Sequence, residues 1–361
     1  MTITTRKAVV SGLAGLGVVA LLAGCGQAPE SAGGGGSTGE AIDYLPCIVS
    51  DSGGFDDKSF NQSSYEGLVE AADKLGIKEK HVESSSESDF GPNITSLVDQ
   101  GCDMIITVGF LLADATKEAA TANPDVDFVI LDDNSIDMDN VKPVVYDTAQ
   151  AAFLAGYVAA DTSKTGSVGT FGGMQIPTVT IFMDGYADGV NYYNEQKGKD
   201  VKVVGWDVDK QNGVFTGGFD ANDTAKQSAT TVINQGVDVL LPVGGPIYQS
   251  AIEAIKDSGK DIAMIGVDAD QYETVDSDKD LFLTSIMKQM KQGVFDIVTQ
   301  AAKGSFSAEP YVGTLDNDGV GIAPFHDWKD KVNPDLQGEL DTIKAGIIDG
   351  SIKVESPSSP K

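Results

Sequence analysis

The chain has 361 residues, of which 41% are hydrophobic, so it has enough apolar side chains for two globular lobes and too many for a disordered acidic tail. Its 54 acidic residues far outnumber its 25 basic ones, and the net charge of −29 argues against a nucleic acid partner, because a polyanion would be repelled. Two histidines and three cysteines supply few of the side chains that most hydrolases and metal sites need, so the composition favours a binding protein without metal or cofactor over an enzyme.

The first predicted element is an export signal. Arg6 and Lys7 precede an uncharged apolar run over residues 8–22, which is shorter than the roughly 20 residues that a membrane-spanning helix needs. The string LAGC that ends at Cys25 resembles a bacterial lipobox, in which the cysteine sulfur receives a lipid and the preceding residues are removed. This pattern predicts that residues 1–24 are a lipoprotein signal peptide; an ordinary signal peptide with a chance cysteine is the alternative.

The next segment is a predicted linker. Residues 25–41 contain no aromatic or large aliphatic side chain, so they should form a flexible leash after the lipidated cysteine. Folding is therefore expected to begin at residue 42. We expect a protein that is held by lipid at the extracytoplasmic face of the cell membrane and kept soluble by its negative charge.

From Tyr44 onward, short β-rich runs alternate with amphipathic helical stretches, which is typical of a doubly wound α/β fold with parallel sheets. The first clear helix, over residues 63–77, has apolar side chains at helical spacing. The predicted strands are residues 45–50, 81–84, 104–108, 128–131, 167–171, 201–206, 239–243 and 263–267.

Two segments of the chain resemble each other. The segment from Asp103 to Asp132 begins DMIITVG and ends FVILD, and the segment from Asp238 to Asp268 begins DVLLPVG and ends MIGVD. The terminal aspartates are 29 and 30 residues apart. This similarity indicates two similarly wound lobes, although βαβ units of this length commonly look alike.

Ligands of open parallel sheets bind beyond the carboxyl ends of the strands. Here those ends carry aspartates, which accept hydrogen bonds, and glycines, which let a ligand approach the backbone. We expect the following residues to line one cleft between the lobes: Asp51, Gly109, Phe110, Asp132, Gly172, Gly173, Gly244, Gly245 and Asp268.

The densest polar stretch, residues 51–61, lies between the first strand and the first helix. It ends like a phosphate-binding loop, but Asp57 stands where that motif needs glycine, so we reject a nucleoside triphosphate site. Ser59 and Gln62 fit a capping box for the helix that follows. Phe60 is either a plug on the core or a stacking face for a ligand, and the sequence alone leaves both open.

The remaining two cysteines lie close together in the expected sheet. Cys47 is in the first predicted strand and Cys102 just precedes the third, and these strands are neighbours in the order 2-1-3. Export favours oxidation. A disulfide and two buried free thiols are both open, and neither cysteine has a plausible catalytic role.

Six motifs carry a resemblance to a known family: GFDDKSFN at 54–61, GGM at 172–174, TGGFD at 216–220, VGG at 243–245, GVD at 266–268 and TSIMK at 284–288. From Tyr44 to Val354 the chain resembles the basic membrane protein family of bacterial substrate-binding lipoproteins, the purine nucleoside receptors of ABC importers. The resemblance implies a type I periplasmic-binding-protein fold, in which a three-strand hinge joins two doubly wound parallel-sheet lobes.

The same resemblance implies a base-binding site. Phe60 from the first lobe and Phe219 from the second would sandwich a purine, and Phe215 competes for the second role. Asp51 and Asp132 would face polar edges of the base.

It also implies a ribose-binding group. Asp268 would accept hydrogen bonds from the ribose hydroxyls, and Lys288 would donate to them. The backbone near Gly245, or near Gly244, would add a further hydrogen bond.

The lobes are expected over residues 42–164 with 288–312 and over residues 165–287 with 313–361. The resemblance implies a monomeric receptor that closes on guanosine, inosine or adenosine and presents it to ABC permease subunits without an enzymatic step. One alternative is a type I receptor for a sugar or a sugar-like signal, which needs no second aromatic face. Another is a lipid-anchored nucleoside hydrolase, which converging carboxylates permit although no nucleophile is paired with a base.

Overall fold

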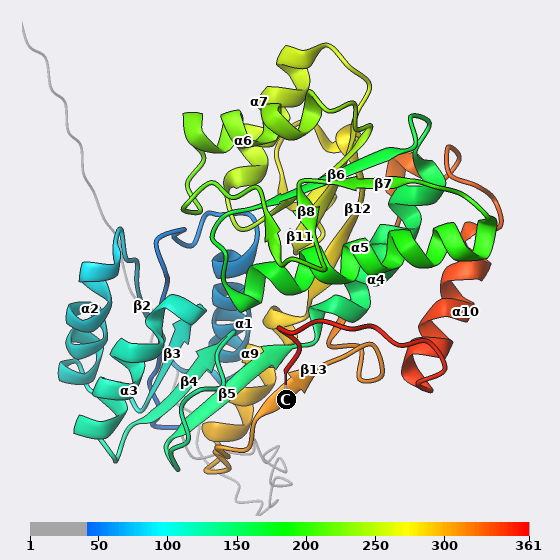
Figure 1. Cartoon of the computed structure of the whole chain (residues 1–361). Helices are drawn as coiled ribbons and strands as arrows, with labels where there is room; N and C mark the ends of the chain where they lie inside the picture. The colour runs from blue at the N-terminus through cyan, green and yellow to red at the C-terminus, as the bar shows by residue number, and fades with distance from the viewer. Residues whose placement is uncertain (1–41, 361) are drawn as a thin grey trace, which may run out of the picture. The chain divides into compact units, whose positions relative to one another are not determined.

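The computed structural model describes residues 42–360, which fold into two α/β lobes (Figure 1). The predicted signal peptide, the linker and the lipidated Cys25 lie outside the described residues. Within residues 42–360, no helix combines the length and apolar character needed to cross a bilayer.

The first sheet has six strands in the order β13-β5-β4-β3-β1-β2, and every pair in it is parallel. This order includes the expected neighbours β2, β1 and β3. The inner strands β1 and β3 are buried along their whole length, because helices cover both faces of the sheet. The strands are β1 (Pro46–Val49), β2 (Lys80–Val82), β3 (Met104–Val108), β4 (Asp127–Leu131), β5 (Val141–Tyr146) and β13 (Tyr311–Gly313).

The second sheet also has six strands, in the order β14-β12-β11-β10-β6-β7. Strand β14 runs antiparallel to β12, so the prediction of purely parallel sheets is wrong at this edge. The strands are β6 (Ser167–Gly172), β7 (Lys202–Val204), β10 (Val239–Val243), β11 (Ala263–Asp268), β12 (Phe282–Lys288) and β14 (Val320–Ile322). A short antiparallel ribbon, β8 (Trp206–Asp207) with β9 (Asn212–Gly213), lies beside β6 and β7.

Helices cover both sheets. The first of them ends at Leu75, and Gly76 follows in the left-handed conformation with φ 69°, a common way to stop a helix. The helices are α1 (Phe60–Leu75), α2 (Glu87–Asp99), α3 (Ala113–Ala122), α4 (Thr148–Thr162), α5 (Pro177–Lys197), α6 (Asp223–Ile233), α7 (Ile247–Ser258), α8 (Gln271–Thr274), α9 (Met290–Ala301) and α10 (Leu336–Ile348).

The chain passes between the two sheets three times, after β5, after β12 and after β13. After the first crossing, α4 packs on α5, β12 and β14, all of which belong to the second lobe. The structure therefore puts the first crossing near Asp147, one helix earlier than the expected boundary at residue 164. The physical reason is the burial of α4 on nearly all sides, since only Gln150, Asp161 and Thr162 of this helix are partly exposed.

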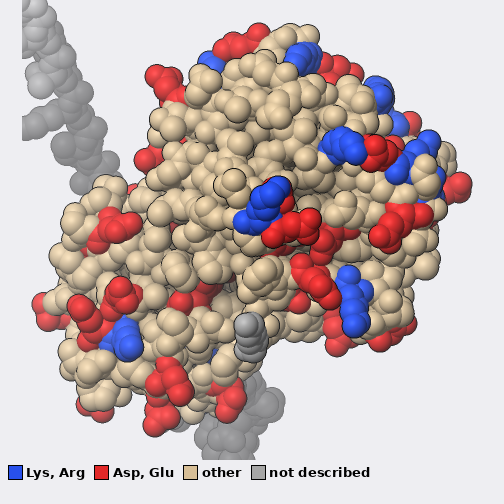
Figure 2. All heavy atoms as spheres, viewed as in Figure 1, with Lys and Arg blue, Asp and Glu red and all other residues tan. Residues whose placement is uncertain are grey.

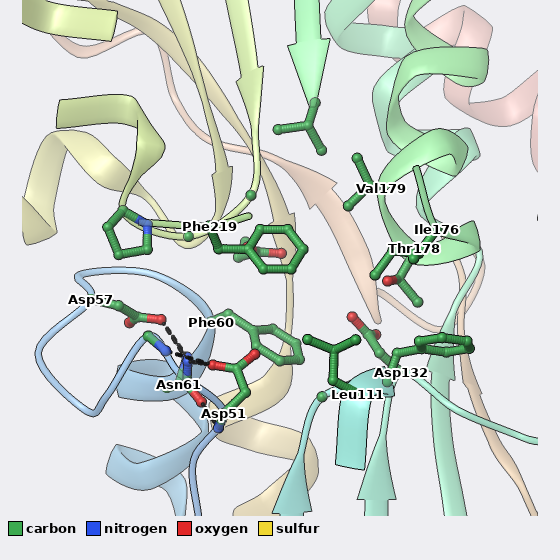
Figure 3. Close-up of a pocket in the computed structure, with 18 of the residues that line it drawn as sticks. Asp51, Asp57, Phe60, Asn61, Leu111, Asp132, Ile176, Thr178, Val179 and Phe219 are labelled. Carbon is green, nitrogen blue, oxygen red and sulfur yellow. Dashed lines mark hydrogen bonds between the residues drawn. The ribbon is translucent and has the colours of Figure 1, made fainter. Parts of the chain in front are cut away.

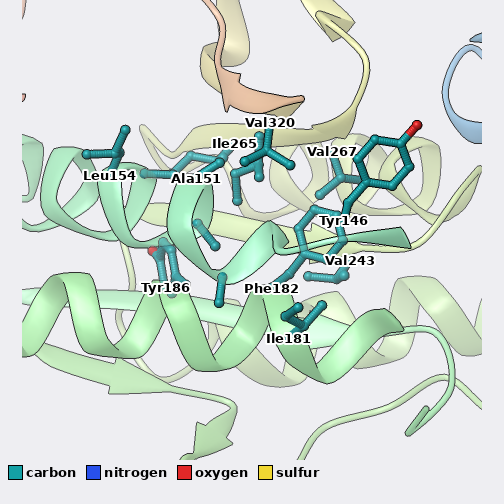
Figure 4. Packing of buried hydrophobic residues seen from close by; sticks show 14 of the residues in the cluster. Tyr146, Ala151, Leu154, Ile181, Phe182, Tyr186, Val243, Ile265, Val267 and Val320 are labelled. Atoms are coloured by element: carbon teal, nitrogen blue, oxygen red, sulfur yellow. The ribbon is translucent and has the colours of Figure 1, made fainter. Parts of the chain in front are cut away.

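Helices α4 and α5 lie against each other with their backbones in contact, and side chains such as Ala151, Phe182 and Tyr186 fill the surrounding core (Figure 4). A methyl group added to Gly189 of α5 would lie 2.0 Å from the carbonyl oxygen of Phe153 on α4. Only glycine permits this separation. The two helices that follow the hinge thus form one rigid layer of the second lobe.

Cys47 and Cys102 form a disulfide in the structure, with their Cα atoms 6.0 Å apart. Both residues are buried, and the bond ties β1 to the segment that leads into β3.

Acidic side chains are scattered over the face of the molecule that Figure 2 shows, and lysines lie beside carboxylates at several places. Examples are Lys197 with Glu339 and Lys210 with Asp207. Such exposed pairs contribute little to stability, and the surface keeps an excess of negative charge.

Candidate functional site

A pocket lies between the lobes, where strands of both sheets end (Figure 3). It has a volume of about 60 Å³. This is smaller than the roughly 300–1,000 Å³ of ordinary small-molecule sites, so the lobes must separate to admit a ligand of nucleoside size. All seven predicted ligand-binding residues line it: Asp51, Phe60, Asp132, Phe219, Gly245, Asp268 and Lys288.

The loop between β1 and α1 is held by its own carboxylates. Asp57 accepts hydrogen bonds from the backbone N–H groups of Ser59, Asn61 and Gln62 at 2.8–3.0 Å. The Asn61 amide in turn donates to Asp51 at 2.8 Å and to Asp57 at 3.0 Å (Figure 3). This network fixes the orientation of the Asp51 carboxylate at the pocket wall. Asp57 caps the helix, so the predicted capping box of Ser59 and Gln62 is wrong.

The Ser59 hydroxyl is used differently. Its Oγ lies 3.1 Å from the carbonyl oxygen of Val267 and 3.1 Å from Oδ2 of Asp268, both at the end of β11 in the other lobe. A hydroxyl has a single proton, so it donates to one of these acceptors at a time. Thr274 makes a second bond between the lobes, from Oγ1 to the carbonyl oxygen of Lys58 at 2.7 Å. These contacts connect the loop of the first lobe to the second lobe.

Two aromatic rings face the pocket, one from each lobe. Phe60 begins α1 and is 8% exposed, and Phe219 approaches from the loop after β9 (Figure 3). The Phe219 ring rests on glycine backbone: a methyl group on Gly173 or Gly244 would come within 2.4–2.6 Å of it. These glycines therefore leave the space in which the ring lies.

Phe215, the competing candidate, lies elsewhere. Its ring packs edge-on against Trp206 with centroids 5.9 Å apart and covers Gly172. It does not line the pocket, whereas Phe219 does. Gly244 and Gly245 both line it, so the structure leaves either one able to contact a ligand.

A buried ionic group lies beside Phe60 in the same pocket, since Lys288 Nζ is 5.1 Å from the centre of the Phe60 ring. Lys288 Nζ lies 2.6 Å from Asp132 Oδ2 and 3.5 Å from Asp268 Oδ1, and all three side chains are at most 9% exposed. Burial disfavours the ammonium, but the two carboxylates outweigh it and raise the pKa of Lys288. Burial also raises the pKa of Asp132, against the opposing effect of Lys288. Asp132 thus lies with Asp268 and Lys288 in the pocket, and that it faces a polar edge of the base, as Asp51 does, stays a prediction.

The two lobes repeat the same backbone conformation at the pocket. Gly109 after β3 has φ 120° and Gly244 after β10 has φ 131°. Asp132 after β4 has φ 64° and Asp268 at the end of β11 has φ 69°, the left-handed region that aspartate tolerates better than most residues. These matching angles support the internal similarity seen in the sequence, because each lobe ends equivalent strands in the same way.

Several lining residues were not predicted. Asn61 lies in the polar stretch of residues 51–61, but no sequence pattern indicated that its side chain would hydrogen-bond to Asp51. Ile176 directly precedes α5, and Thr178 and Phe182 lie in its first two turns, where the sequence indicated only the preceding glycines. They resemble ordinary residues of an amphipathic helix. Within residues 42–360, no group of three or more histidine, cysteine, aspartate or glutamate side chains is arranged to hold a metal ion.

Comparison with known proteins identifies the family. Residues 46–357 match the model of the Bmp family, described as ABC transporter substrate-binding protein PnrA-like. The chain is 32% identical to the ABC transporter nucleoside-binding protein BmpA of Lactococcus lactis over 97% of this chain and 99% of that protein. It is 31% identical to the CD4+ T-cell-stimulating antigen of Listeria monocytogenes over 88% and 89% of the two chains.

A similar structure supports the same assignment. A solute-binding protein of an ABC transporter system from Aeropyrum pernix K1 superimposes with a TM-score of 0.77 at 25% identity, covering 87% of this chain and 94% of that one. The predicted two-lobed type I periplasmic-binding-protein architecture is confirmed. This chain belongs to the Bmp family of ABC transporter substrate-binding proteins, which bind solutes and are not enzymes.

Proposed function

We propose that this substrate-binding protein captures a purine nucleoside between its lobes. The observation that carries the proposal is the pairing of two phenylalanine walls, one from each lobe, with a buried carboxylate–lysine group in the same pocket. A flat purine would lie between Phe60 and Phe219 once the lobes have separated to admit it, and each stacking contact would contribute roughly 1–3 kcal/mol. The Lactococcus lactis relative is a nucleoside-binding protein, which agrees with this ligand class.

In the proposed complex, the base and the ribose have separate polar partners. Asp51, oriented by Asn61, accepts from the edge of the base. Asp268 accepts from the vicinal ribose hydroxyls, because one carboxylate can accept from both of them. Lys288 donates to the ribose and balances the charges of Asp132 and Asp268.

Ligand bound to both lobes favours the closed state of the hinge, and a permease can recognise that closed shape. The hydrogen bonds of Ser59 and Thr274 also join the two lobes, because they connect the β1–α1 loop of the first lobe to the second lobe.

We further propose that Cys25 carries the lipid that holds this monomeric receptor at the extracytoplasmic face of the membrane.

Native mass spectrometry of the protein purified without added ligand tests the function. We expect a co-purified mass that corresponds to a purine nucleoside. A thermal-shift panel of guanosine, inosine, adenosine, cytidine, ribose and galactose gives the matched comparison, because a ligand that binds only the folded state raises its melting temperature. Stabilisation by the sugars alone would replace the nucleoside proposal with a sugar receptor.

Asp51 predicts a pH dependence of binding. Burial raises the pKa of this carboxyl to about 6, although hydrogen bonds from Gly53 and Asn61 oppose the shift. If the ionised carboxylate accepts the N1–H group of a 6-oxopurine, inosine should bind roughly tenfold more weakly one pH unit below the pKa, where most of the carboxyl is protonated. Calorimetric titration of inosine between about pH 5 and 7.5 measures this change.

The stability of the ligand-free protein should respond to Asp51 in the opposite direction. Its pKa in the folded state lies above the unfolded value of about 3.9, so ionisation costs folding free energy, and the cost grows as the pH rises from about 4 to about 6. The Asp51→Asn variant should flatten both dependences. Equal inosine affinity at both ends of the pH range in the unchanged protein would exclude Asp51 as the acceptor.

A further inference from the structure

A second chamber adjoins the nucleoside pocket. It has a volume of about 320 Å³ and shares four lining residues with the first pocket, namely Phe110, Asp132, Thr178 and Lys288. The two spaces therefore meet at the Lys288–Asp132 pair. None of the predicted ligand contacts needs this second space.

The far wall of the chamber is built by the last described residues of the chain. Pro357, Ser358, Ser359 and Pro360 line it. Hydrogen bonds attach this segment: Ser356 donates to Asp184 at 2.6 Å and Ser359 to Asp147 at 2.8 Å, and Ser358 and Thr180 share a hydroxyl contact at 2.8 Å. Asp184 is fully buried and also accepts from Trp206 at 2.9 Å. These hydrogen bonds make the wall an integral part of the fold.

The chemistry of the chamber disfavours anions. Among its described lining residues Lys288 is the one cation, and it is already paired with Asp132. Asp133 adds a second carboxylate, oriented by hydrogen bonds from the backbone N–H and the hydroxyl of Ser135 at 2.9 and 2.8 Å. A phosphate in this space would meet two carboxylates with no free positive partner. Hydroxyl groups and apolar surface make up much of the remaining wall, which suits an uncharged or cationic group.

We propose that this chamber is a subsite for an uncharged or cationic substituent on the 5′ carbon of a bound nucleoside, and that it rejects a 5′-phosphate. The inference rests on the proposed function. In the proposed complex the base lies toward Asp51 and the 2′ and 3′ hydroxyls contact Asp268 and Lys288, which leaves the 5′ carbon as the ribose position that can carry a further substituent. Asp132, next to Lys288, marks the entrance to the chamber in that direction. The receptor would then take up nucleosides whose phosphate a dephosphorylation reaction has already removed.

Calorimetric titration of the intact protein with four ligands tests this subsite: adenosine, 5′-amino-5′-deoxyadenosine, 5′-deoxy-5′-methylthioadenosine and AMP, with the guanosine series used if guanosine is the tighter parent. The amine and the thioether should bind within about tenfold of the parent, because the chamber holds them without strain, and AMP should bind at least about a hundredfold more weakly, because of like-charge repulsion. AMP binding within tenfold of the parent overturns the proposal. So does a hundredfold loss for both uncharged and cationic derivatives.

A variant that fills the chamber separates the subsite from the nucleoside pocket. Ser358→Trp places a bulky side chain at the far wall, with Ser358→Ala as the matched control that loses only the contact to Thr180. In the tryptophan variant the thioether should bind at least about tenfold more weakly, while adenosine binds as before. Ser135→Leu repeats the test from the first lobe, should the tryptophan displace the terminal segment. Equal losses for adenosine and the thioether in both filling variants would contradict the subsite. If none of adenosine, guanosine and inosine binds the unchanged protein, the proposed function fails and the subsite fails with it, which titration of these three parents reveals without any variant.

Discussion

The Lys288→Met variant should lose about 3–5 kcal/mol of unfolding free energy near pH 7.5, because it leaves Asp132 and Asp268 facing each other in a buried site without a counter-charge. Methionine keeps the length and apolar stem of lysine, so the loss reports the charge and not a cavity. Urea denaturation of the ligand-free protein, followed by intrinsic fluorescence, measures it.

The pH dependence of this loss gives a second check. In the variant a buried carboxyl without its ammonium partner has a raised pKa in the folded state, so its destabilising effect appears above the unfolded value of about 3.9 and grows with pH. The stability difference between the variant and the unchanged protein should therefore shrink as the pH falls toward 4. A constant difference between pH 4 and 7.5 would instead indicate lost packing.

A double variant identifies the partner. Adding Asp132→Asn to Lys288→Met removes one of the two carboxylates and should recover part of the lost stability, whereas Asp132→Asn alone should be destabilising because it removes the 2.6 Å ion pair. Additive losses in the double variant would mean that the two residues do not stabilise each other.

The sequence predicted those strands in which a continuous run of apolar residues is buried in the structure. Strands β3 and β10 were predicted with their observed bounds, because each is a short apolar run that is followed directly by glycine. Strand β5 was missed, since Lys142 and Pro143 interrupt its apolar pattern. The edge strand β14 has three residues, too few to show a period.

The sequence predicted the pocket residues that lie at the carboxyl ends of strands. Asp132 and Asp268 were selected because each lies at the carboxyl end of a parallel strand, one in each sheet, and both line the single pocket between the lobes. Contacts between the lobes could not be predicted in the same way. The bond from Ser59 to Asp268 joins residues 209 positions apart, and the local sequence of Ser59 favoured the helix cap that Asp57 in fact supplies.

If the ligand is the proposed nucleoside, the Asp268→Ala variant should bind it at least tenfold more weakly and keep its fold. Hydrogen bonds to a charged group contribute about 1.5–3 kcal/mol each, so loss of both proposed ribose contacts would exceed about a hundredfold. The fold should survive because Lys288 keeps its 2.6 Å partner Asp132. Calorimetric titration measures the affinity, and circular dichroism checks the fold. Asp209→Ala, which removes an exposed carboxylate, is the matched control and should bind normally.

Ser59→Ala distinguishes direct contact of Asp268 with the ligand from an effect on lobe closure. The Ser59 hydroxyl is the hydrogen-bond donor that reaches Asp268 from the first lobe, and the carbonyl oxygen of Val267 is an equally close acceptor. If Asp268 contacts the ribose, Asp268→Ala should weaken binding far more than Ser59→Ala, because in the serine variant the carboxylate remains in place. Equal losses in the two variants would mean that Asp268 acts by holding the lobes together. Unchanged affinity in Asp268→Ala would remove this residue from the site altogether.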